Sequence, residues 1–151
     1  MRPTVEEQLL GTCRILEKVV SPCVADPYAH TLLQGLIGNL RMLTSALPAV
    51  PGFLNNDNRA TAGLLRQFQV AVAPDLAARI ALALGRPEPE ATDMTALDQR
   101  NCELRELFSQ ALGDAGLTPA LRAAALAHMT ERAARAPMRY VPTASPPAKA
   151  T

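Results

Sequence analysis

Aromatic residues are scarce in this chain of 151 residues. Tryptophan is absent, and three phenylalanines and two tyrosines are the only aromatic side chains. Alanine and leucine are abundant instead, with 27 and 22 copies. Strands favour aromatic and β-branched residues, whereas alanine and leucine favour helices. The composition therefore predicts an all-α protein with almost no sheet.

The chain also lacks an excess of charge of either sign. Its formal net charge is +1, and 19% of its residues are charged. A protein that binds nucleic acid or anionic lipid through its overall electrostatic field carries a clear positive excess. The charge balance argues against both kinds of partner, and we expect no membrane association and no nucleic-acid binding.

Cysteine patterns, apolar runs and metal-binding motifs are missing as well. Cys13, Cys23 and Cys102 form no paired framework and no C-x-x-C motif, so neither a disulfide scaffold nor a thiolate zinc site is indicated. No apolar run approaches the roughly 18 residues of a membrane span, and acidic residues precede any apolar stretch at the N-terminus. No Glu-x-x-His pair or calcium loop occurs. We expect a cytoplasmic protein without a metal or cofactor.

The pattern of caps, prolines and apolar residues predicts five helical segments. A capping box opens the first, and an Asp-Pro or Thr-Pro pair opens two of the others. The expected helices cover residues 4–20, 26–47, 55–84, 92–112 or 95–112, and 118–135, and the third is bent or broken at Pro74. Together they predict a four- to five-helix antiparallel bundle over residues 1–136. Residues 137–151, rich in proline and alanine, are predicted to form a flexible tail.

Large apolar residues at helical spacing mark the faces that should be buried. In the second helix the expected buried stripe consists of Tyr28, Leu32, Leu36, Leu40, Leu43 and Leu47. Five side chains from the whole chain are the expected anchors of the core or of an interface: Tyr28, Leu36, Leu43, Phe68 and Phe108.

Polar residues interrupt several of these apolar stripes, and they are the candidate ligand-binding residues. They are Asn39, Asp57, Asn58, Thr61, Asn101 and His128. A buried amide without a partner costs roughly 1–3 kcal/mol, so these groups must bond either each other or a ligand. One interpretation is a pocket for a small molecule or acyl chain. The other is structural: Asp57 and Asn58 cap the third helix, and Asn39 bonds Asn101.

Two further features bear on function. His128 shares a helix face with Leu121 and Ala125 and has Glu131 three residues later, so a histidine–carboxylate pair is geometrically possible. The fifth helix also carries several arginines after a short turn, which leaves a helix-turn-helix regulator as a weaker alternative. These arginines are Arg122, Arg132, Arg135 and, just beyond the helix, Arg139.

Short motifs give the chain a resemblance to other proteins. The motifs are Asp26-Pro27-Tyr28-Ala29, Asn39-Leu40-Arg41 and the Leu/Arg-rich stretch 100–107. At these positions the chain resembles small, uncharacterised bacterial helical proteins encoded near acyl-CoA dehydrogenases and phosphotransferase-like kinases. The resemblance implies an accessory role in acyl-CoA or xenobiotic catabolism, and it supplies no catalytic residues.

The sequence thus favours a non-catalytic helical interaction protein, homodimeric and associated with a metabolic enzyme. The main alternative is a ligand-binding protein or an enzyme that uses the buried Asn, Asp and His residues. No catalytic residue is assigned in either case.

Overall fold

The computed structural model describes residues 2–114 and 116–137 of the protein. Its α-helices, in chain order, are α1 (Val5–Ile15), α2 (Pro27–Ala46), α3 (Val50–Phe68), α4 (Pro74–Leu84), α5 (Met94–Gly113) and α6 (Pro119–Arg135). These described residues contain no strand, so the predicted all-α class is confirmed. The expected tail lies outside the described residues except for Pro137.

Side-chain caps begin α1, α2 and α6 at the places where the sequence predicts them. Thr4 accepts a hydrogen bond from the Glu7 amide at 3.2 Å, and the Glu7 carboxylate accepts one from the Thr4 amide at 2.8 Å. Asp26 accepts from the Ala29 amide at 2.7 Å, and Thr118 caps α6 in the same way. Each cap supplies a partner for a helix-end amide that has none within the helix.

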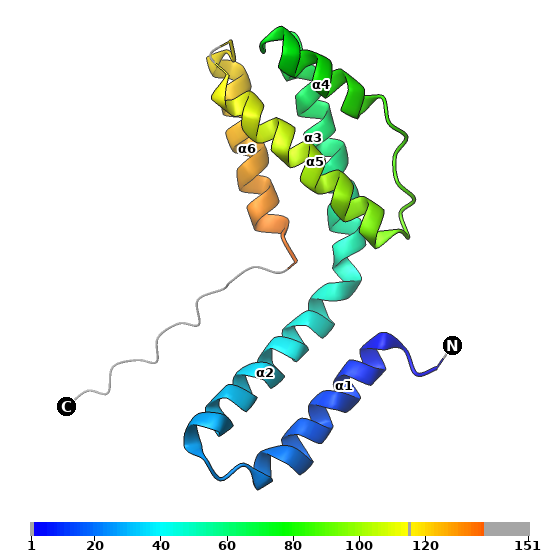
Figure 1. Ribbon diagram of the computed structural model, residues 1–151, viewed down its shortest axis with the longest axis vertical. Helices are drawn as coiled ribbons and strands as arrows, with labels where there is room; N and C mark the ends of the chain where they lie inside the picture. The colour runs from blue at the N-terminus through cyan, green and yellow to red at the C-terminus, as the bar shows by residue number, and fades with distance from the viewer. Residues whose placement is uncertain (1, 115, 138–151) are drawn as a thin grey trace, which may run out of the picture.

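The chain is organised as a hairpin joined to a bundle (Figure 1). After α1, a wider helical turn (Leu16–Val20) and a tight turn (Ser21–Cys23) reverse the chain, and α2 then packs against α1. A second tight turn (Leu47–Ala49) leads into α3, so α3 continues from α2 into the bundle with a bend between the two helices. The α1–α2 hairpin occupies one end of the molecule, and α3, α4, α5 and α6 form the bundle at the other.

The third predicted segment is two helices. α3 starts at Val50, five residues before the expected start, and ends at Phe68. A turn follows, and α4 begins at Pro74, where the missing proline amide costs nothing because a first-turn amide has no partner within the helix. α3 is the central helix of the bundle, and it packs against α4, α5 and α6.

The hydrophobic core lies in the bundle. Phe68 and Phe108 are buried there, as predicted, and their rings stack with centroids 5.7 Å apart. The other large side chains of the core include Leu65, Ile80 and Leu104, none of which is exposed to solvent. The core therefore draws on α3, α4 and α5 together.

The expected burial of the α2 stripe is wrong for the single chain. Tyr28 is 72% exposed, Leu32, Leu36, Leu43 and Leu47 are also exposed, and Leu40 is half-buried. The buried residues of α2 are Ile37, Thr44 and Ala46. The reason is geometric: α2 extends away from the bundle, and among the described helices it is α1, continued by the wider turn after it, that packs along α2, so only one side of α2 is covered.

Asp114 ties the loop after α5 to the turn between α3 and α4. Its carboxylate accepts hydrogen bonds from the amides of Ala73, at 2.9 Å, and Gly116, at 2.8 Å. These bonds and the nearby Arg122 guanidinium hold the pKa of Asp114 below its ordinary value of 3.8. A carboxylate with a lowered pKa stabilises the fold above its unfolded-state pKa, and this contribution is lost as the pH falls through the folded pKa.

We therefore expect Asp114→Asn to reduce stability in a pH-dependent way. The difference in Tm between the wild type and the variant should be constant above about pH 5 and should shrink as the pH falls below 3.8. Thermal unfolding followed by circular dichroism from pH 7 to pH 2.5 measures this difference. Asp98→Asn, which removes an exposed carboxylate of α5, is the control. A difference for Asp114→Asn that stays the same at every pH contradicts the assignment.

Candidate functional site

A buried polar cluster lies where α3, α5 and α6 meet. From α3 it takes Asp57, Asn58 and Thr61, which are buried; Thr61 lies one turn after the other two, three residues from Asn58 and four from Asp57, so the three border the same side of the helix. All three lie in the interior of α3, since the helix begins at Val50. The prediction that Asp57 and Asn58 cap this helix is therefore wrong.

Asn101 of α5 joins the two neighbouring α3 residues. Its side-chain amide donates to Asp57 Oδ2 at 2.7 Å and to Asn58 Oδ1 at 2.9 Å. Asn58 in turn donates to the backbone carbonyl of Leu97 at 3.0 Å. Because these bonds join the two helices at defined positions, they set the register of α3 against α5.

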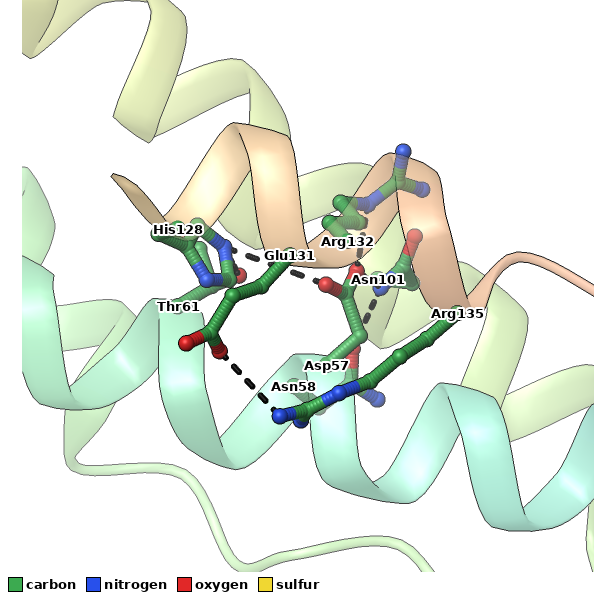
Figure 2. A network of polar contacts seen from close by, with 8 residues as sticks. All are labelled: Asp57, Asn58, Thr61, Asn101, His128, Glu131, Arg132 and Arg135. Atoms are coloured by element: carbon green, nitrogen blue, oxygen red, sulfur yellow. Dashed lines mark hydrogen bonds and ion pairs between the residues drawn. The ribbon is translucent and has the colours of Figure 1, made fainter. Parts of the chain in front are cut away.

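α6 completes the cluster with His128 and Arg132, which lie one turn apart on the same face (Figure 2). Arg132 donates from Nε to Asp57 Oδ2 at 2.8 Å. His128 Nε2 lies 3.1 Å from Thr61 Oγ1 and 3.8 Å from Asp57 Oδ1. The Asp57 carboxylate, almost fully removed from solvent, is thereby bonded by a guanidinium and an amide.

The cluster does not have the geometry of a nucleophilic triad. In such a triad one imidazole nitrogen takes the proton of the hydroxyl nucleophile and the other bonds the carboxylate. In this structure Nε2 of His128 is the nitrogen nearest to both Thr61 and Asp57. One nitrogen cannot serve both purposes at once, so Thr61 is not activated by this arrangement.

The predicted pairing of His128 with Glu131 is also absent from the described contacts. Glu131 pairs with Arg135, with Nη2 and Oε2 3.2 Å apart, and this pair is mostly exposed. His128 instead packs its ring edge-on against Phe108, with centroids 5.6 Å apart. The imidazole therefore faces the bundle and its polar cluster.

Two cavities flank the cluster, and His128 and Arg132 line both. The smaller, of about 220 Å³, lies between α3 and α6 and includes Phe53, Asp57 and Arg135 in its wall. The larger, of about 360 Å³, lies between α5 and α6. Asn58 and Asn101 line neither cavity and bond one another, so the structural interpretation holds for these two side chains. The other cluster residues each line at least one of the two cavities.

Five of the six predicted site residues are therefore neighbours in the structure, and the sixth lies elsewhere. Asp57, Asn58, Thr61, Asn101 and His128 meet in the cluster, whereas Asn39 is exposed on α2. No hydrogen bond between Asn39 and Asn101 is present in the described part of the chain, so that predicted pairing is wrong. Asn39 was grouped with the others because it borders the α2 stripe, and that stripe is itself exposed.

Arg132 is the cluster residue that the sequence analysis missed as a site residue. The available signal was its position four residues after His128 on the same face of α6. Its guanidinium also lies over the Phe53 ring, with the central carbon 5.6 Å from the ring centroid. An arginine among surface-type residues gives no hint that its partner is a buried aspartate on a helix 75 residues away in the chain.

The arginines that suggested a DNA-binding helix are engaged within the chain. Arg122 donates to the backbone carbonyls of Leu112 and Asp114, at 2.8 and 2.7 Å. Arg132 and Arg135 are paired as described above, and Arg139 lies outside the described residues. Phosphate contacts by Arg122 or Arg135 would have to compete with these bonds, so the structure offers no support for the helix-turn-helix alternative.

Three comparisons, with protein-family models, with curated proteins and with solved structures, found no match for this chain. Within the described residues, no group of three or more His, Cys, Asp and Glu side chains is placed to hold a metal ion. A search of the same residues found no helix with the length and apolar character needed to cross a membrane.

Proposed function

We propose that this chain is a non-catalytic helical interaction protein that forms a homodimer through the α1–α2 hairpin. The contact surface is the α2 stripe, defined here as the exposed residues Tyr28, Leu32, Leu36, Leu43 and Leu47. The observation that carries the proposal is the exposure of an apolar helix face that no other described residue covers.

Exposed apolar side chains are concentrated in the hairpin. Fifteen large hydrophobic side chains are exposed in the described part of the chain, and eleven of them lie between Val5 and Leu47. Single exposed leucines are ordinary, but a contiguous apolar patch of more than a few hundred Å² marks an interaction surface. This concentration supports an interface at the hairpin.

α2 has two apolar faces that point in different directions. Leu36 and Ile37 follow one another, so their side chains leave the helix about 100° apart. Ile37 is 2% exposed, whereas Leu36 is 51% exposed. A helix that is apolar around much of its circumference is typically buried on more than one side, and α1 covers one side only.

A second copy of the chain fits this surface better than a charged partner would. In its 20 residues α2 has one charged side chain, Arg41, which is already paired with Glu17 of the wider turn after α1 at 2.6 Å. Two stripes facing each other across a two-fold axis therefore bring no like charges together. Two hairpins also make a four-helix arrangement in which each helix has neighbours on both sides. Apolar contact cores of this kind are typical of homodimers.

An accessory role beside a metabolic enzyme is the further part of the proposal. Its support is the resemblance of residues 26–29, 39–41 and 100–107 to the small bacterial helical proteins named above. The enzyme would belong to acyl-CoA or xenobiotic catabolism. In this role the bundle remains free to contact the enzyme while the hairpins hold the dimer together.

The mass of the protein in solution tests the dimer. Sedimentation equilibrium at micromolar concentration should give twice the 16.1 kDa of one chain. Because the interface is apolar, the mass should change little between low and high salt. A mass of one chain at every protein concentration up to about 100 micromolar would contradict the proposed dimer.

A further inference from the structure

The last two helices leave a groove between them. α5 and α6 are joined by a short loop, but they diverge from it, and α6 packs mainly on α3 (Figure 1). The resulting α5–α6 groove is the larger cavity described above, of about 360 Å³. This volume falls within the range of small-molecule sites, which is about 300–1,000 Å³.

We propose that the α5–α6 groove binds a monocarboxylate with an unbranched apolar chain. The apolar chain would lie along Phe108, Leu112 and Met129, and the carboxylate would bind Arg105 and Arg132 beside His128. This inference does not depend on the proposed dimer, because the α2 stripe lies on a different helix at the other end of the molecule.

The apolar part of the groove has a wall on each helix. Phe108 and Leu112 are one turn apart on α5, and Met129 faces the groove from α6 with 48% of its surface exposed. A hydrocarbon chain in the groove removes this apolar surface from water, which stabilises the bound state by about 25 cal/mol for each Å² buried. The wall therefore favours a ligand with a hydrocarbon body.

The polar part of the groove is cationic. Arg105 is exposed and has no hydrogen-bond or ion-pair partner in the described residues. Arg132 lines the groove as well as the smaller cavity, where its guanidinium lies over the Phe53 ring; it uses Nε for Asp57, and its two terminal nitrogens make no hydrogen bond in the described residues. Guanidinium groups bind carboxylates through paired hydrogen bonds, so two of them beside one groove favour an anionic head group.

The two parts lie in the order that an amphipathic ligand needs. Leu112 is next to the α5–α6 loop, whereas Arg105 lies seven residues earlier, about 10 Å further along α5. On α6, Arg132 is likewise in the turn farthest from the loop. The apolar side chains of the groove therefore lie nearer the loop than the cationic groups do, Phe108 and Met129 by about one turn and Leu112 by about two.

The charges exclude the opposite kind of ligand. No carboxylate lines this groove among the described residues. The nearest carboxylate in the cluster, Asp57, already accepts bonds from Asn101 and Arg132 at Oδ2. A cationic head group would face two guanidinium groups without an acidic partner, and a neutral head group would receive weaker hydrogen bonds from Arg105 and Arg132 than a carboxylate does.

Octanoate, octanamide and butyrate are the probes that test the proposal. Titration calorimetry with the full chain should show saturable octanoate binding, with a Kd of about 1 mM or tighter. Octanamide should bind at least tenfold more weakly because it lacks the charge, and butyrate should bind at least tenfold more weakly because it lacks most of the chain. Backbone amide NMR shifts should map the octanoate to α5 and α6.

Variants separate the groove from unspecific binding. Arg105→Gln should weaken octanoate binding about tenfold without changing the fold, since Arg105 is exposed and makes no contact that the bundle needs. Arg66→Gln, which removes an exposed cation of α3 that does not line the groove, should leave the Kd unchanged. Equal binding of octanoate and octanamide, an unchanged Kd for Arg105→Gln, or NMR shifts confined to the α2 stripe would each overturn the proposal.

Discussion

The double variant Leu32→Glu/Leu36→Glu is expected to convert the dimer into a monomer. Both leucines belong to the α2 stripe, with 56% and 51% of their surface exposed in the single chain. Burying a leucine contributes about 1.5–3 kcal/mol, and a two-fold axis places each substitution in the interface twice. The dimer therefore loses the burial of four leucines, and losing even half of their combined contribution raises the dimer Kd by roughly 10²–10⁴-fold.

Sedimentation equilibrium and circular dichroism together measure this effect. The mass should fall to that of one chain, while the helical content of the bundle is retained, because neither leucine contacts the bundle core. Leu82→Glu is the matched control: Leu82 is 69% exposed on α4, and this substitution should leave the mass unchanged. A dimer that survives the double variant would place the interface elsewhere and would leave the exposed stripe unexplained.

The second large effect is expected from Asp57→Asn. Asp57 is buried, and its carboxylate bonds Arg132 at 2.8 Å and Asn101 at 2.7 Å. The substitution keeps the shape of the side chain, but it removes the charge that Arg132 requires and replaces an acceptor with an amide. Breaking a buried, hydrogen-bonded ion pair costs about 3–5 kcal/mol, and Arg132 can recover part of this by turning toward solvent.

We therefore expect a loss of about 2–4 kcal/mol in the free energy of unfolding, or a fall in Tm of roughly 10 °C. Urea denaturation and thermal unfolding measure it. Glu131→Gln is the control, because Glu131 forms an exposed pair with Arg135 one turn away, and such pairs contribute less than about 0.5 kcal/mol. Equal stability of the two variants would show that the cluster does not hold α6 on α3.

Local signals in the sequence predicted the helices well. The capping box at Thr4 and the caps at Asp26 and Thr118 are present in the structure, because a cap depends on residues three or four apart. The start of α5 was placed at Thr92 or Thr95, whereas Asp93 is the cap. Several polar residues stand there in succession, and each could have capped the helix.

The polar cluster was predictable in part. Helical periodicity correctly grouped Asp57 with Thr61 on one face and placed Asn101 and His128 on the inward faces of their helices. Periodicity says nothing about which faces meet across the bundle. It therefore added Asn39, which is exposed on α2, and missed Arg132, whose partner lies on another helix.

The sequence by itself determined the all-α class, the helix caps and the apolar faces, since these follow from the properties of residues close together in the chain. The tertiary structure decided which of those faces are covered. Ile37 is buried and Leu36 is exposed because α2 leaves the bundle and meets α1 on one side only. Both residues have the same apolar character, so only the position of the neighbouring helix could distinguish them.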